Sequence, residues 1–247
     1  QVSGVQKFIP IGQPGNEADE DRPRVGSHGA VGYPFEMGKN RVSNAEYCVF
    51  LNAVAQTEDP YGLYNPKMSI ERSNSESSSP STFHYSPRQE AARLPVTYVS
   101  WFDAARYCNW LHGGQTEIGS YDLTKSSPPL QRMNGAKAFL PSENEWYKAA
   151  YFDPRKNNYT YFRDSFGGLR SRLSGRNPSR SPYGMMGMDD PIWDWAETAV
   201  GSLFRCVRSN TWFQGNNRQA AGHFYSNSVL ELGNLGFRIA RPLGKNY

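Results

Sequence analysis

One helix-start signal occurs three times in this sequence, and it constrains the fold more than any other feature. A serine is followed three positions later by an acidic residue, directly before apolar residues at helical spacing, at Ser43-x-x-Glu46, Ser100-x-x-Asp103 and Ser142-x-x-Glu145. In this arrangement the serine hydroxyl accepts an unpaired backbone N–H of the first helical turn, and the acid accepts the N–H of the serine. The acid also stabilises the positive end of the helix dipole. The sequence therefore predicts three short helices that begin at these serines.

Long polar segments separate the predicted helices. Residues 69–93 are rich in serine, residues 156–184 are similarly irregular, and short strands are expected at 204–208 and 235–240. The 23 glycines and 17 prolines among 247 residues agree with a large loop content, while 14% aromatic residues are enough for a substantial core. We expect an irregular α+β fold. The tryptophans predicted to be mostly buried in its core are Trp101, Trp146, Trp193 and Trp195.

The composition excludes several classes of protein. The mean hydropathy is −0.70, and no apolar run approaches the roughly 18 residues of a membrane-spanning helix, so no membrane span is expected. A net charge of +4 gives no general reason to expect nucleic-acid binding. Neither a fixed repeat nor the composition of collagen or a coiled coil is present. We expect one domain, in which residues 1–34 add N-terminal strands and an acidic loop to residues 35–247.

The cysteines and the first residue bear on where the protein works. Cys48, Cys108 and Cys206 are too few for a disulfide framework, and their spacing does not suggest a zinc site. We expect free thiols at Cys48 and Cys108, with a bond between these two as the alternative. Mature exported chains often begin at a residue other than methionine, and this chain begins at Gln1. We therefore expect a secreted, periplasmic or cell-surface protein.

Five motifs in a fixed order resemble one protein family. They are MGKNRVSNAEY at 37–47, LPVTYVSWFDAARYCNWL at 94–111, FLPSENEW at 139–146, PIWDW at 191–195 and NLGFR at 234–238. The formylglycine-generating enzyme (sulfatase-modifying factor) family has similar motifs, which read G-x-x-x-V-T-N-x-x-Y, P-V-x-x-V-S-W-x-D-A-x-x-Y-C-x-W-L, R-L-P-T-E-A-E-W, N-V-W-E-W and N-x-G-F-R. The resemblance covers roughly residues 35 to 243. It implies a C-type-lectin-like fold that carries long loops.

The resemblance does not extend to the family's metal chemistry. Its sulfatase-activating members oxidise a substrate cysteine with a copper ion that two cysteine thiolates hold, and both thiolates lie in the segment that matches 209–238. This segment contains no cysteine here, and Gln214 and Gln219 lie near the expected positions. An amide is a poor ligand for soft cuprous ion. A second branch of the superfamily takes its iron-binding histidines mostly from an additional helical domain, for which residues 1–35 are too short. We expect neither copper nor iron.

The resemblance also implies a calcium ion, wrapped by the loop that contains the motif at 191–195. Calcium takes several hard oxygen ligands, and backbone carbonyls can supply them from any residue. The ligands predicted here are the carboxylates of Asp194 and Asp190 and the carbonyls of Ile192 and Gly187. As an alternative, Asp194 forms an ion pair with an arginine such as Arg238.

The segment that replaces the family's active-site region has a composition suited to binding. An aromatic ring can stack on a ligand while amides and a guanidinium group fix its orientation through hydrogen bonds. The predicted ligand-binding residues are Trp212, Gln214, Asn216, Asn217, Arg218 and His223. The alternative for Trp212 is a buried position on a strand.

These observations lead to a functional prediction. We expect a non-catalytic extracellular binding or structural assembly module that contacts a protein or a glycan on a formylglycine-generating-enzyme-like scaffold, with calcium as its one expected cofactor. Exposed loops on a rigid core suit such recognition. The alternative is a metal-dependent oxidoreductase, of the formylglycine-generating or non-haem iron sulfoxide synthase type, with altered metal ligands.

Overall fold

A computed structural model gives the fold and describes residues 6–20, 27–75, 82–125, 130–160, 180–188, 190–209 and 222–244. In this part of the chain the helices are α1 (Asn44–Val54), α2 (Trp101–Gly113) and α3 (Glu143–Tyr151). The strands are β1 (Phe8–Ile11), β2 (Phe35–Gly38), β3 (Ile70–Ser75), β4 (Thr82–Pro87), β5 (Phe152–Asp153), β6 (Asn158–Tyr159), β7 (Trp193–Val200), β8 (Phe204–Ser209), β9 (Gly222–Asn227), β10 (Leu235–Phe237) and β11 (Ala240–Pro242). The fold is α+β, with short strands in several small sheets.

All three predicted helix starts are confirmed, because each helix begins directly after its predicted serine. At α1 the hydroxyl of Ser43 accepts the backbone N–H of Glu46 at 3.3 Å, and the Glu46 carboxylate accepts the N–H of Ser43 at 2.8 Å. The same reciprocal pair of hydrogen bonds opens α2 and α3. These bonds satisfy backbone donors that the first turn of a helix otherwise leaves unpaired.

A four-stranded sheet in the order β10-β7-β8-β9 forms the centre of the molecule. Strands β7 and β10 are parallel, while β8 pairs antiparallel with both β7 and β9. The register places Asp194 opposite Arg208, and Arg208 opposite His223. Helix α3 packs against β7 and β8. This sheet therefore carries one predicted metal ligand, Asp194, on β7 next to β8, and β8 and β9 border residues 210–221.

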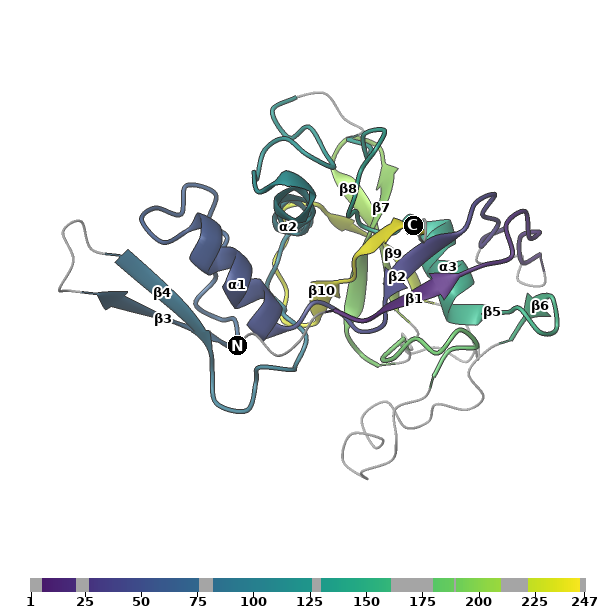
Figure 1. The fold of residues 1–247 in the computed structure, drawn as a ribbon, viewed down its shortest axis with the longest axis horizontal. Coiled ribbons are helices and arrows are strands. Elements are labelled where there is room, and N and C mark those ends of the chain that lie inside the picture. The colour runs from purple at the N-terminus through teal and green to yellow at the C-terminus, as the bar shows by residue number, and fades with distance from the viewer. Residues whose placement is uncertain are drawn as a thin grey trace.

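The N-terminal and C-terminal strands meet in a second sheet, in the order β1-β2-β11. Figure 1 shows β1 in purple and the yellow C-terminal chain on either side of β2. Residue Met37 lies opposite Ile9 on one side and Ala240 on the other. Residues near both ends of the chain thus belong to one sheet.

The serine-rich segment at 69–93 forms a hairpin of β3 and β4, where the sequence predicted irregular structure. The hairpin projects beside α1 (Figure 1). The side-chain amide of Asn52 in α1 donates to the carbonyl of Tyr85 at 2.7 Å and accepts the N–H of Tyr85 at 2.9 Å. Ile70 and Tyr85 are buried, while Arg72 and Ser73 are exposed. The prediction was wrong because polar residues dominate the composition, while a few buried side chains hold the hairpin against the helix.

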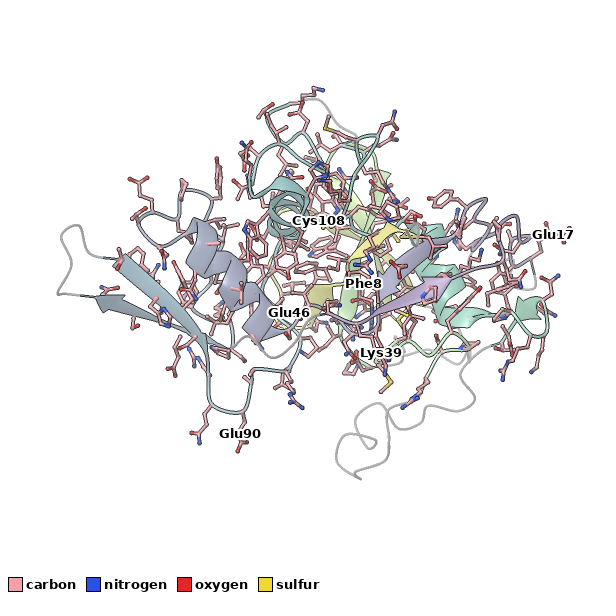
Figure 2. All side chains as sticks on the ribbon, viewed as in Figure 1. Phe8, Glu17, Lys39, Glu46, Glu90 and Cys108 are labelled. Carbon is pink, nitrogen blue, oxygen red and sulfur yellow. The ribbon has the colours of Figure 1, made fainter. Side chains whose placement is uncertain are left out.

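The core is rich in aromatic side chains. Trp101, Trp146 and Trp195 are fully buried, as predicted, whereas Trp193 is only partly buried at the start of β7. Cys108 of α2 lies in the crowded centre of the molecule (Figure 2). None of the helices in the described residues has the length and apolar character that a membrane span requires.

Candidate functional site

Most of the predicted ligand-binding residues fall in the segment of the sequence between β8 and β9. Trp212, Gln214, Asn216, Asn217 and Arg218 fall within 210–221 and are outside the described residues, as is Gln219. The backbone of His223 lies on β9, directly opposite Arg208 of β8, and its side chain is outside the description. Their binding role therefore stays a prediction.

The four predicted calcium ligands do come together, and they surround the guanidinium group of Arg41. Arg41 Nε donates to Asp194 Oδ1 at 2.7 Å, and Nη1 donates to Asp190 Oδ1 at 2.8 Å. Nη1 also donates to the carbonyl of Gly187 at 2.8 Å, and Nη2 donates to the carbonyl of Ile192. One positively charged side chain thus contacts all four predicted ligands.

Asp194 is held by a second arginine and by a tryptophan. Arg238 Nε donates to Asp194 Oδ2 at 3.0 Å, and the indole N–H of Trp146 donates to the same oxygen at 2.9 Å. The side chains of Asp194 and Arg238 are fully buried. The pairing with Arg238 is the alternative that the sequence left open, and the structure shows it together with the pairing to Arg41.

A buried arginine stands on β8 next to the segment 210–221. Arg208 is fully buried, its Nη2 pairs with Glu143 of α3, and its guanidinium lies 5.3 Å from the ring centre of Tyr147. In the part of the chain that the structure describes, its Nε and Nη1 find no hydrogen-bond partner. A buried donor without a partner is costly, so these N–H groups are potential contacts for a polar ligand or for water.

Aromatic rings are exposed on the neighbouring strand. Phe224 and Tyr225 of β9 are 46% and 47% exposed. The ring of Phe224 also contacts the partly buried Trp193 of β7, edge to face, with ring centres 5.3 Å apart. An exposed aromatic ring combines a large apolar surface with low conformational freedom, which favours recognition of a ligand.

The cysteine side chains are free thiols in the interior, as predicted for Cys48 and Cys108. Burial raises the pKa of Cys48 to about 12. Burial likewise raises the pKa values of Cys108 and Cys206 well above the ordinary range. Such groups stay protonated at neutral pH, and the thiolate is the form that attacks substrates or binds metals. Among the described residues, no group of three or more His, Cys, Asp or Glu side chains is placed to hold a metal ion.

A further polar cluster lies beside a cavity of about 640 Å³ between α3 and the turn that joins β7 to β8. Arg132 binds both Glu145 and Glu197, with N–O distances of 2.7 and 2.5 Å. Its guanidinium also lies 3.8 Å from the ring centre of Phe139. Arg205, which also lines the cavity, donates to the carbonyl of Glu197.

The sequence interpretation missed four of these arginines, namely Arg41, Arg132, Arg205 and Arg208. The partners of Arg41 lie 146 to 153 positions away along the chain. A partner that is so distant in the sequence leaves no local pattern. The one available signal was the acids within otherwise apolar motifs, because a buried acid needs a positively charged partner from elsewhere in the chain. Arg238, inside the N-x-G-F-R motif, was the one such partner that the sequence named.

Comparisons with known proteins agree with the motifs. A family model described as "Sulfatase-modifying factor enzyme 1-like domain" matches residues 7–243. The mouse (Mus musculus) protein named "Inactive C-alpha-formylglycine-generating enzyme 2" is 25% identical over 187 residues, which cover 64% of this chain. The matched region is 52% of that protein, so the chain spans about half the length of this relative.

Solved structures share the fold at low sequence identity. CarF has a TM-score of 0.62 and 16% identity, with 97% of this chain and 99% of that chain covered. Treponema denticola variable protein 1 has a TM-score of 0.61 and 16% identity, over 98% of both chains. PvdO from Pseudomonas aeruginosa has a TM-score of 0.53 and 14% identity, over 96% of this chain and 92% of that one. Because the family model spans nearly the whole chain, this protein belongs to the sulfatase-modifying factor family of formylglycine-generating-enzyme-like domains.

Proposed function

We propose that this chain is a non-catalytic extracellular binding or assembly module, which contacts a glycan or a protein where β8 and β9 are joined. The observation that carries the proposal is the exposed ring of Tyr225 on the strand that follows 210–221; the neighbouring Phe224 is also exposed, on the other face of β9. The predicted binding residues of that segment add amides and a guanidinium next to these rings in the sequence. Stacking surface together with directional hydrogen bonds is what binding a sugar ring or a peptide requires.

The state of the thiols supports a role without thiolate chemistry. The segment 209–238 has no cysteine, and Cys206, which precedes it on β8, is fully buried with a raised pKa. A thiol in that state is a poor copper ligand. The mouse relative carries the word "inactive" in its name, which is in line with the proposal.

The state of the acids supports the same role. The buried acids Glu143, Glu145, Asp194 and Glu197 are each paired with arginine. A carboxylate held this way stabilises the fold and is less suited to move protons. These acids therefore support a structural interpretation of the interior.

A binding experiment tests the proposal at the β8–β9 end. The purified chain is screened on a glycan array and, in parallel, against secreted proteins from its own source by cross-linking. Tyr225→Ser and Arg218→Ala are expected to lose at least tenfold in affinity for the ligand so found. Tyr61→Ser is the matched control, because Tyr61 is similarly exposed, at 42%, and lies at the α1 end of the molecule. Equal affinity of all three variants would place the binding surface elsewhere.

An activity assay tests the competing function. The chain is supplied with Cu(I) or Fe(II), a cysteine-containing peptide and oxygen, and oxygen uptake is measured. We expect no uptake above that of the metal and peptide without protein. Uptake that depends on the protein would instead support the metal-dependent oxidoreductase with altered ligands.

A further inference from the structure

The loop between Gly187 and Asp194 has the oxygen atoms of a cation site, but an arginine fills it. Both carboxylates and both carbonyls predicted above as calcium ligands accept hydrogen bonds from Arg41. The side chain of Arg41 is 1% exposed, so its guanidinium lies inside the molecule.

The charges of the described residues in this cluster already balance. Asp190 and Asp194 contribute two negative charges, and Arg41 and Arg238 contribute two positive charges, all within one set of ion pairs. A calcium ion would add two uncompensated positive charges next to two buried guanidinium groups. An unpaired buried charge is strongly unfavourable, so the cluster as built disfavours a metal ion.

The oxygen atoms are also committed to hydrogen-bond donors. Asp194 Oδ1 accepts from Arg41, and Oδ2 accepts from Arg238 and Trp146. Asp190 Oδ1 accepts from Arg41 and from the backbone N–H of Ile192 at 3.0 Å. Calcium needs six to eight oxygens at about 2.3–2.6 Å. The residues present therefore fit a planar guanidinium group with several donors, and they do not fit a calcium ion.

The backbone is shaped for the same side chain. Gly187 has a φ of +66°, in the left-handed region that favours glycine. A Cβ at this position would lie 3.0 Å from Asp190 Oδ2 and 3.2 Å from Arg41 Nη1. Glycine thus lets the carbonyl and the guanidinium approach each other closely.

We propose that the guanidinium group of Arg41 is the permanent cation of the loop 187–194 and that this chain folds without calcium there. Burial by itself lowers the pKa of Arg41, but the Asp194 and Asp190 carboxylates outweigh it and raise that pKa above its ordinary value. An arginine guanidinium is charged at neutral pH in any case, because its ordinary pKa is far above neutrality. This inference goes beyond the binding function and does not depend on it.

Calcium titration of the unmodified chain tests the proposal directly. After dialysis against EDTA, the chain is titrated with calcium chloride in a calorimeter, and its thermal midpoint is measured in calcium and in EDTA. We expect no stoichiometric binding and the same midpoint in both buffers. One calcium bound per chain with a raised midpoint, both lost in Asp194→Asn, would overturn the proposal.

A second experiment removes the guanidinium group of Arg41 and measures the effect on stability. Arg41→Ala is expected to lower the thermal midpoint by roughly 10 °C, because Asp190 loses its arginine partner and the buried Asp194 keeps only one of its two arginines, Arg238. Arg241→Ala is the matched control, since Arg241 is 45% exposed and pairs with Glu36 near the surface. We expect almost no shift for this control. Equal midpoints for the two variants would contradict the proposal, and if Arg41→Ala does not fold, the calcium titration of the parent chain still decides.

Discussion

Outside the Arg41 cluster, Arg132 neutralises two buried carboxylates at once. Its guanidinium joins Glu145 at the start of α3 to Glu197 on β7. Both carboxylates are buried, so each needs a positive partner to offset its lost hydration. The same arrangement of an acid held by arginine recurs at Asp194 and at Glu143.

Replacing this arginine should destabilise the protein strongly. Arg132→Met leaves two buried carboxylates unpaired, and we expect the free energy of unfolding to fall by about 3–5 kcal/mol. Arg241→Met is the control, because Arg241 is 45% exposed and its partner Glu36 keeps contact with solvent, so a much smaller loss is expected. Urea unfolding of both variants measures the difference. Similar losses would contradict the prediction.

The buried carboxyl of Asp103 should make the stability of the fold depend on pH. Burial raises the pKa of its carboxyl from 3.8 to about 6, although hydrogen bonds from Ser100 act in the opposite direction. The folded state therefore holds this proton more tightly than the unfolded state. The resulting stabilisation is complete below pH 3.8 and is lost as the pH rises through about 6.

The variant Asp103→Asn should remove this dependence. Between pH 4 and pH 7, the wild-type free energy of unfolding minus that of the variant should fall by about 2–3 kcal/mol. Subtracting the variant cancels the contributions of all other titrating groups. Chemical denaturation at several pH values gives the curve. A difference that stays constant or rises with pH would show that Asp103 titrates normally.

At the scale of elements, the helix caps are local devices that hold α1, α2 and α3 in place. The Ser142 hydroxyl accepts the N–H of Glu145 at 3.2 Å, and the Glu145 carboxylate accepts the N–H of Ser142 at 2.6 Å. Ser142→Ala should cost about 1 kcal/mol of stability because the first of these bonds is lost. Ser202→Ala, in the exposed turn after β7, is the control and should change stability by less than about 0.5 kcal/mol. Thermal unfolding compares the two, and equal costs would argue against the cap.

Elements that depend on local sequence were predictable, and those that depend on distant contacts were not. Helix starts were predictable because a capping box lies within four consecutive residues, as at Ser43 and Glu46. The β3–β4 hairpin was not, because its serine-rich strands depend on contacts with α1, such as the bonds between Asn52 and Tyr85. The contact of the four predicted calcium ligands with Arg41 could not be read from the sequence, because Arg41 comes from a distant part of the chain.

At the scale of the whole molecule, β1, β2 and β11 bring both ends of the chain into one sheet. The family match over residues 7–243 likewise includes both ends. We expect a single cooperative unfolding transition by calorimetry. Limited proteolysis should cut within 69–93 or 156–184 and leave the fragments associated. Two fragments that separate and remain folded would show that the chain has two domains.

The β1-β2-β11 sheet has a consequence for the protein under mechanical load. Both outer strands are antiparallel to β2, so β1 and β11 run parallel to each other on its two sides. Tension applied at Lys7 and Leu243 pulls these strands in opposite directions along their length, and the hydrogen bonds to β2 then share the force. Pulling from Gly12 and Leu243 instead loads the same end of both strands and opens the bonds one at a time. In single-molecule stretching, the first geometry should therefore require the higher force.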